Sequence, residues 1–215
     1  MLETTSTKQH RDTSLYGIKP GFVRLLAPIR KNLARRGVSP TTVTLAAIPV
    51  EIAVAICLVI GARTPSALLL VPVLTVAWMA LNALDGSLAR TTGGVTSVGT
   101  VLNELVDRFG DLAVVWVAFI VAPPPVAATV GLAILTSELV AAIGWAATGH
   151  RHFRGPMGKP DRAAVVAVGS LAAIIWPVAL TVAFVVIGVG AAIGVGVRTR
   201  AVIDVAHAID AGDEQ

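Results

Sequence analysis

The side chains best suited to chemistry lie between residues 82 and 111, where carboxylates and amides interrupt strongly apolar sequence. One set has the spacing i, i+3, i+4 and i+7 that shares a face of a helix: Asn82, Asp85, Gly86 and Ala89. A second set follows at steps of four residues and shares a face of the next helix: Gly99, Asn103, Asp107 and Asp111. The Gly93-Gly94 pair between them predicts a turn.

These two faces predict a helical hairpin whose facing surfaces carry carboxylates, amides and small residues. Carboxylate and amide oxygens are hard ligands suited to Mg²⁺ or Mn²⁺. Glycines clear room for a bulky ligand to approach the backbone, and polar groups at membrane depth are costly enough to indicate function. The sequence therefore predicts a site that holds a phosphate ester through a metal ion.

This segment resembles the signature of the CDP-alcohol phosphotransferase (CDP-alcohol phosphatidyltransferase) family, D-x2-D-G-x2-A-R-x8-G-x3-D-x3-D. All spacings agree, and six of the eight specified positions carry the family residue. The departures are Asn82 and Asn103, which replace the first and third aspartates and keep a carbonyl oxygen without its charge. A register one turn later would end on Asp107 and Asp111, but it breaks the eight-residue spacing and places Asn103 at the glycine position.

The resemblance implies a role for each motif residue. A Mg²⁺ or Mn²⁺ site is implied at four positions: Asn82, Asp85, Asn103 and Asp107. Contacts to the nucleotide and its phosphates are implied at four others: Gly86, Ala89, Arg90 and Gly99. Asp107 is also our candidate for the catalytic base that takes the proton from the acceptor hydroxyl.

The implied reaction moves a phosphatidyl group from a CDP-linked lipid such as CDP-diacylglycerol to a small alcohol or polyol phosphate. CMP is released, and the enzyme would serve phospholipid biosynthesis, with membrane lipids as its surroundings and a homodimer as its assembly. Two alternatives remain open. The two asparagines favour a catalytically weakened member that binds CDP-lipid or supports a partner enzyme, whereas a small transporter would need an internal repeat that is not evident.

The elements that must position this site are apolar. Of the 215 residues, 55% are hydrophobic and 14% charged, and the mean hydropathy is +0.79, which is typical of a membrane protein rather than a soluble domain. Runs of about the length that a bilayer requires cover 42–62, 66–85, 101–122, 126–148, 163–176 and 178–197. Trp176-Pro177 is the only break between the last two runs, and we expect a tight turn there.

Residues 20–36 combine an apolar stripe with five basic residues, which predicts an amphipathic helix in the membrane interface. The fold class is therefore an all-α integral membrane protein with six transmembrane helices preceded by this interfacial helix. We divide the chain into a polar N-terminal segment (1–19), the membrane domain (20–203) and a polar C-terminal tail (204–215).

Basic residues predict the orientation of the chain. Lysines and arginines gather in the N-terminal segment, in the loop after the fourth run and near the C-terminus, while the opposite loops hold only Arg63. The positive-inside rule then places both termini and the motif on the cytoplasmic side of the cell membrane. The basic residues follow topology, so we expect no nucleic-acid binding.

The loop after the fourth run, 150–162, is a second candidate site. Four of its residues have the charge to bind the phosphate of an acceptor, although they equally fit a role in topology alone: Arg151, Arg154, Lys159 and Arg162. Among the intramembrane acids, Glu51 and Glu138 either line the site or pair with bundle-facing groups, and Glu104 and Arg108 have the spacing of an i, i+4 ion pair.

Overall fold

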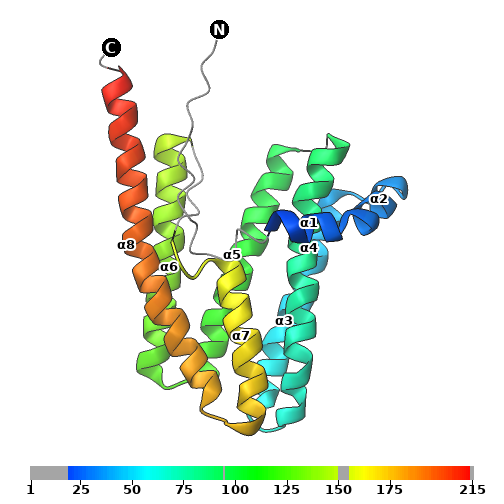
Figure 1. Cartoon of the computed structure of the whole chain (residues 1–215), viewed down its shortest axis with the longest axis vertical. Coiled ribbons are helices and arrows are strands. Elements are labelled where there is room, and N and C mark those ends of the chain that lie inside the picture. The colour runs from blue at the N-terminus through cyan, green and yellow to red at the C-terminus, as the bar shows by residue number, and fades with distance from the viewer. Residues whose placement is uncertain (1–18, 94, 150–154, 214–215) are drawn as a thin grey trace.

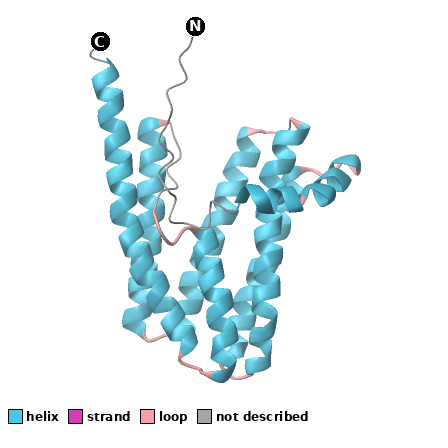
Figure 2. Cartoon of the chain, in the orientation of Figure 1, coloured by secondary structure: helices cyan, strands magenta, loops and turns pink. Residues whose placement is uncertain are grey.

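The computed structural model describes residues 19–93, 95–149 and 155–213, and within these ranges every regular element is a helix (Figure 2). Eight α-helices and one short 3-10 helix, η2, follow one another: α1 (Lys19–Leu25), α2 (Ala27–Arg35), α3 (Pro40–Gly61), η2 (Pro65–Leu69), α4 (Leu70–Thr92), α5 (Ser97–Val121), α6 (Pro124–Thr148), α7 (Lys159–Ile175) and α8 (Ala179–Asp213). The all-α fold that the sequence predicted is confirmed.

The basic segment at residues 20–36 forms two short helices instead of the single helix that we expected. The break falls at Leu26, and Pro28 occupies one of the first two positions of α2. Proline has no backbone N–H to continue a helix and is tolerated in the first turn, so a new helix starts around it. Leu26 is buried in a small core with Val43 of α3 and Leu84 and Leu88 of α4, which anchors α1 and α2 beside the motif.

The helix ends around the motif are set by local capping. Ser39 accepts a hydrogen bond from the backbone N–H of Thr42 at 3.1 Å, and Pro40 opens α3. Gly93 ends α4 with φ of 66°, a left-handed conformation that glycine adopts without steric cost. Thr96 then caps α5 by accepting from the N–H of Gly99 at 3.0 Å. The predicted turn between the two motif helices is therefore present.

The long helices form a bundle whose two sides diverge at the end where the last turns of α8 lie (Figure 1). α6 packs along α8 on one side, and α3 packs against α4 and α5 on the other. Below the divergence, one apolar core joins the sides, with Val117, Val130, Ile134, Phe184 and Ile187 at its centre. α7 begins about halfway along the bundle, so its first residues enter the space between the two sides (Figure 1).

The surface and the helix lengths are those of a membrane protein. Within the described ranges, four helical segments are long and apolar enough to cross a membrane: Pro40–Gly61, Pro65–Thr92, Pro124–Thr148 and Ala179–Gly212. Among the other two long helices, α5 carries the acidic motif residues and α7 has only 17 residues. The number of six crossings therefore stays a prediction.

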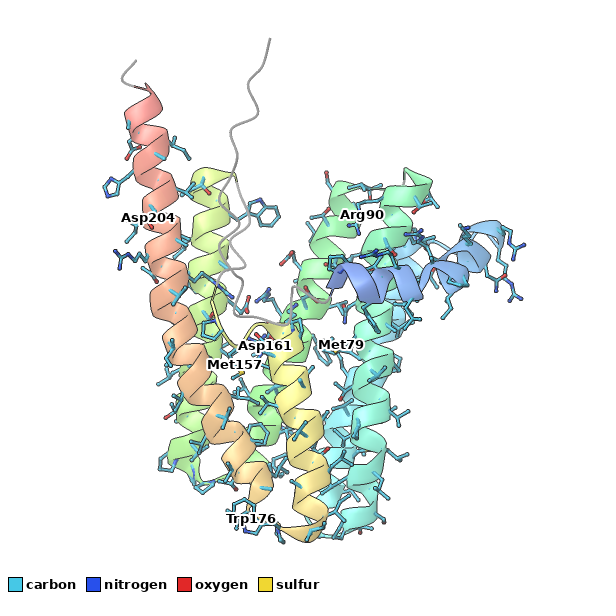
Figure 3. All side chains as sticks on the ribbon, viewed as in Figure 1. Met79, Arg90, Met157, Asp161, Trp176 and Asp204 are labelled. Atoms are coloured by element: carbon cyan, nitrogen blue, oxygen red, sulfur yellow. The ribbon has the colours of Figure 1, made fainter. Side chains whose placement is uncertain are left out.

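The last two helices separate at residues 176–178, where the sequence predicted a turn. Trp176 lies at the end of the bundle far from Met157 and Asp161, which lead into and begin α7 (Figure 3). α8 continues for 35 residues, through residues 204–213 that we expected to form a polar tail. The tail is therefore helical in the described part of the chain, and the division of the chain at residue 203 stays a prediction.

Candidate active site

Asp85 is the most enclosed of the motif residues, with 3% of its surface exposed. Its Oδ2 atom accepts a hydrogen bond from Thr44 Oγ1 of α3 at 3.0 Å and from Asn103 Nδ2 of α5 at 2.8 Å. Three helices thus meet at one carboxylate, which fixes its orientation before any ligand binds. Thr44 was missed by the sequence analysis because its position, 41 residues before Asp85, gave no local signal.

The two asparagines of the motif use their amide nitrogens inside the protein. Asn103 donates to Asp85, and Asn82 donates to the backbone oxygen of Trp78 at 3.2 Å. The amide orientation leaves the carbonyl oxygen of each side chain as the atom that could coordinate a cation. Asn103 therefore has a structural role that an aspartate at the same position could not fill, since an ionised carboxylate donates no hydrogen bond.

Asp107 lies one turn beyond Asn103 on α5 and forms an ion pair with Lys159, the first residue of α7. The start of α7 is held by Asp161, whose side chain accepts a hydrogen bond from the N–H of Gly158 at 2.9 Å. This cap places the Lys159 ammonium beside the candidate base. The two residues are 52 positions apart, so only the folded chain reveals the pair.

A separate network of ion pairs lies nearby and joins α5, α6, α7 and α8. Asp111 pairs with Arg162, which is 3% exposed, and with Arg108 at 3.2 Å. Glu138 pairs with Arg108 and lies 3.7 Å from both Arg162 and Arg198. The arginines of this region are thus matched by carboxylates on α5 and α6.

The structure gives contacts for the remaining acidic residues that the sequence left open. Glu104 and Arg108 form the expected i, i+4 ion pair at 3.6 Å. Glu138 both lines the larger cavity and pairs with arginines. Glu51 accepts a hydrogen bond from Trp78 Nε1 and lines a smaller cavity of about 70 Å³.

The larger cavity, of about 1110 Å³, lies between the diverging sides of the bundle. It is lined by all eight motif residues that the sequence singled out: Asn82, Asp85, Gly86, Ala89, Arg90, Gly99, Asn103 and Asp107. Lys159 also lines it, whereas Arg162 lines the smaller cavity. Arg151 and Arg154 lie outside the described residues.

The donor atoms around this cavity fit a hard divalent cation. Asp85 and Asp107 supply carboxylate oxygens, and Asn82 and Asn103 supply amide oxygens, which are the ligand types that Mg²⁺ and Mn²⁺ prefer. Within the described ranges, no group of three or more histidine, cysteine or acidic side chains forms a metal cluster. That result follows from the two asparagines, since they leave only two carboxylates among the four motif positions.

Comparison with known proteins agrees with this geometry. The sequence profile of the family described as CDP-alcohol phosphatidyltransferase matches residues 38–197, which include the whole motif. The inner membrane protein YnbA of Escherichia coli is 36% identical over 167 residues, covering 76% of this chain and 82% of that protein. A phosphatidylinositol phosphate synthase of Mycolicibacterium smegmatis is 31% identical over 167 residues, covering 71% of this chain and 70% of that protein.

Solved structures of phosphatidylinositol phosphate synthase from Mycobacterium tuberculosis have the same fold. The crystal structure in complex with manganese and citrate has a TM-score of 0.66 and 26% identity, covering 82% of this chain and 88% of that one. The crystal structure with CDP-DAG bound has a TM-score of 0.65 and 27% identity, covering 83% and 94%. From the matched profile, the shared motif spacing and these relatives together, we conclude that the chain belongs to the CDP-alcohol phosphatidyltransferase family and is a membrane enzyme of that class.

Proposed function

We propose that this enzyme transfers the phosphatidyl group of CDP-diacylglycerol to the hydroxyl of a small alcohol or polyol phosphate in phospholipid biosynthesis, releasing CMP. The observation that carries the proposal is that all eight motif residues line one large cavity between the two sides of the bundle. The related structure with CDP-DAG bound supports the choice of donor. The manganese complex of the same relative supports a divalent cation.

We assign the cation, Mg²⁺ or Mn²⁺, to the oxygens of Asn82, Asp85, Asn103 and Asp107. When bound, the cation would neutralise charge on the diphosphate of the donor. Asp85 is already oriented by Thr44 and Asn103, so little reorganisation would be needed when the donor arrives.

The nucleotide would lie against the small residues of the motif. Gly86, Ala89 and Gly99 line the cavity together with Arg90, whose side chain passes close to Gly86. Arg90 would place positive charge near the CMP leaving group.

The reaction follows from the position of Asp107 in this cavity. Its carboxylate would take the proton of the acceptor hydroxyl while that oxygen attacks the phosphorus that carries the diacylglycerol. The bond from this phosphorus to the bridging oxygen breaks, and CMP leaves with the electron pair. The product is a phosphodiester lipid, and Lys159 beside Asp107 would orient the carboxylate towards the acceptor.

For the membrane, we propose six crossings by α3 to α8, with α1 and α2 in the interface and both termini and the site on the cytoplasmic side. The apolar surfaces of the four clearest spans and the basic residues near the termini support this topology. We propose a homodimer as the assembly, on the resemblance alone.

A second candidate function is a weakened relative that binds CDP-lipid or supports a partner enzyme. It is favoured by the two asparagines and by the use of Asn103 to hold Asp85. Restoring Asn103→Asp separates the candidates. An active enzyme that depends on the Asn103 donor should lose activity, whereas a decayed site should gain it.

The first experiment is CMP release by the purified protein in lipid nanodiscs, with CDP-diacylglycerol, Mn²⁺ or Mg²⁺ and a panel of acceptors. Acceptor-dependent CMP release that disappears in Asp107→Asn would establish the transferase. Metal-dependent CDP-diacylglycerol binding without release from any acceptor would instead establish the weakened relative.

A further inference from the structure

The wall of the larger cavity formed by α6 and α8 is poor in free positive charge. α6 contributes Glu138 and five uncharged residues to this wall: Leu135, Leu139, Ala141, Ala142 and Trp145. From α8 it is lined by Arg198. In Figure 1, α6 and α8 diverge from the motif helix α4, which supplies other residues of the same lining.

The described lining of the whole cavity is balanced in charge. Four cationic side chains line it, and so do four carboxylates: Arg90, Arg108, Lys159 and Arg198 against Asp85, Glu104, Asp107 and Glu138. Three of the cations are in ion pairs, Arg108 and Arg198 with Glu138 and Lys159 with Asp107. A phosphate monoester carries a charge of about −1.5 to −2 at neutral pH, so its arrival would have to break or outcompete these pairs.

The Glu138–Arg198 pair offers a ligand one hydrogen-bond acceptor and one hydrogen-bond donor. Oε1 of Glu138 lies 3.7 Å from Arg198 and Arg162, which is longer than a hydrogen bond, so it retains capacity to accept one. Arg198 donates from Nη1 to the backbone oxygen of Ser137 at 2.9 Å. Its Nε–H is buried without a hydrogen-bond partner, and an unsatisfied buried donor is costly.

An acceptor and a donor side by side suit hydroxyl groups, because a hydroxyl both donates and accepts a hydrogen bond. The oxygens of a fully ionised phosphate can only accept, and Glu138 would repel them. We therefore propose that the acceptor is an uncharged alcohol with at least three hydroxyl groups, two of them held between Glu138 and Arg198, and not an alcohol that carries a phosphate.

This inference rests on the proposed transferase function and restricts the class of alcohols that can serve as its acceptor. One hydroxyl of the polyol donates to Glu138 and another accepts from Arg198, while a third hydroxyl loses its proton to Asp107. Its oxygen forms the new bond to phosphorus, the bond to the bridging oxygen breaks and CMP leaves. Glu138 and Arg198 thus act as specificity residues, while the chemistry stays at Asp107.

The test compares acceptors in matched pairs that differ only by a phosphate: myo-inositol against inositol 1-phosphate, and glycerol against glycerol 3-phosphate. CMP release by the full chain in nanodiscs with CDP-diacylglycerol and Mn²⁺ should give the higher kcat/KM for the neutral member of a pair. A higher kcat/KM for the phosphorylated members would overturn the inference while upholding the transferase.

The variant Glu138→Gln tests the residues directly, since it keeps the size of the side chain and releases Arg108 and Arg198 from a carboxylate. The ratio of kcat/KM for phosphorylated to neutral acceptors should rise at least about tenfold, chiefly through KM, which corresponds to about 1.4 kcal/mol. Glu104→Gln is the matched control, because it removes the same charge from the same cavity and likewise releases Arg108 from a carboxylate. Equal changes in the two variants would contradict a specific role for Glu138.

Two binding measurements keep the inference separate from the function on which it rests. Metal-dependent binding of CDP-diacylglycerol by Glu138→Gln should match the unmodified protein, which shows that the variant folds. Thermal stabilisation of the donor-loaded protein by myo-inositol should exceed that by inositol 1-phosphate or inorganic phosphate. The reverse order would overturn the inference even without turnover, whereas a failure to bind CDP-diacylglycerol at all would overturn the proposed function.

Discussion

Replacing Gly194 by alanine should disturb both the stability of the bundle and the position of Lys159. Gly194 lies on α8 opposite the segment that leads into α7, and a Cβ there would stand 2.6 Å from the backbone oxygen of Pro156. Ordinary contact begins at 3.4 Å, so the carbonyl or the helix must move by about 0.8 Å. Overpacking of this size costs about 1–3 kcal/mol.

Alanine is also more favourable than glycine inside a helix by about 1 kcal/mol. This gain in stability must be separated from the cost of the clash. Gly196, two residues further along α8, provides the control, because a Cβ there meets nothing within 4 Å. Both variants have the same helical gain, so the difference between them isolates the contact with Pro156. Gly194→Ala should melt roughly 2–12 °C below Gly196→Ala, taking about 2–4 °C for each kcal/mol in a chain of this size.

The assay is tryptophan fluorescence during heating of the purified variants in the same detergent, followed by CMP release. Pro156 precedes Lys159 by three residues, so a shift of this segment should move the ammonium group away from Asp107. A misplacement approaching 1 Å can lower turnover by up to about 100-fold. Equal melting temperatures and equal turnover in the two variants would refute the packing of the 155–158 segment on α8.

The remaining predictions concern the charges of the site. Removal of divalent cations with EDTA should abolish CDP-diacylglycerol binding in a filter assay, and Mn²⁺ should restore it; binding that survives EDTA would contradict the cation assignment. Lys159→Met should tighten Mn²⁺ binding by about tenfold in calorimetry, because it removes a positive charge beside Asp107; weaker binding would speak against the pair. Arg162→Leu should lower the stability by up to about 3–5 kcal/mol, because buried Asp111 loses one of its two partners and keeps only Arg108. The double variant with Asp111→Leu should recover part of this loss in thermal melts, and no recovery would show that the pair is not the cause.

The motif could be predicted from the sequence because its geometry is local. The periodicity of a helix fixes which side chains share a face, so Asp85 and Asn103 were expected on facing surfaces, and a hydrogen bond now joins them. The turn at Trp176-Pro177 was likewise predictable, because one helix spanning more than thirty apolar residues would overshoot a membrane.

Contacts between distant segments could not be predicted in this way. The pairing of Asp107 with Lys159 depends on the path of the chain before α7, and that of Glu138 with Arg198 depends on the packing of α6 against α8. Charge alone suggested that the basic residues of the loop were available for a phosphate. The structure shows that the two described ones, Lys159 and Arg162, are paired with carboxylates.

The C-terminal end of α8 could not be predicted from hydropathy, because the helix continues where the apolar sequence stops. The apolar run ends at Val197, but residues 198–213 contain alanines and few helix breakers, so α8 continues beyond the apolar part. Hydropathy marks the part of a helix that lipid can surround, and it does not mark where the hydrogen-bonded ladder stops.

The length of α8 has a practical consequence. At 1.5 Å per residue its 35 residues extend about 52 Å, while the hydrocarbon layer is about 30 Å thick. In the topology that we propose, the C-terminal third of α8, around Asp204 in Figure 3, would therefore extend beyond the lipid, on the same helix as Arg198 in the wall of the cavity. A fluorophore attached at this end of α8 would therefore move further than the cavity wall itself when the helix tilts. Its displacement could be used to follow movements of the wall during the reaction.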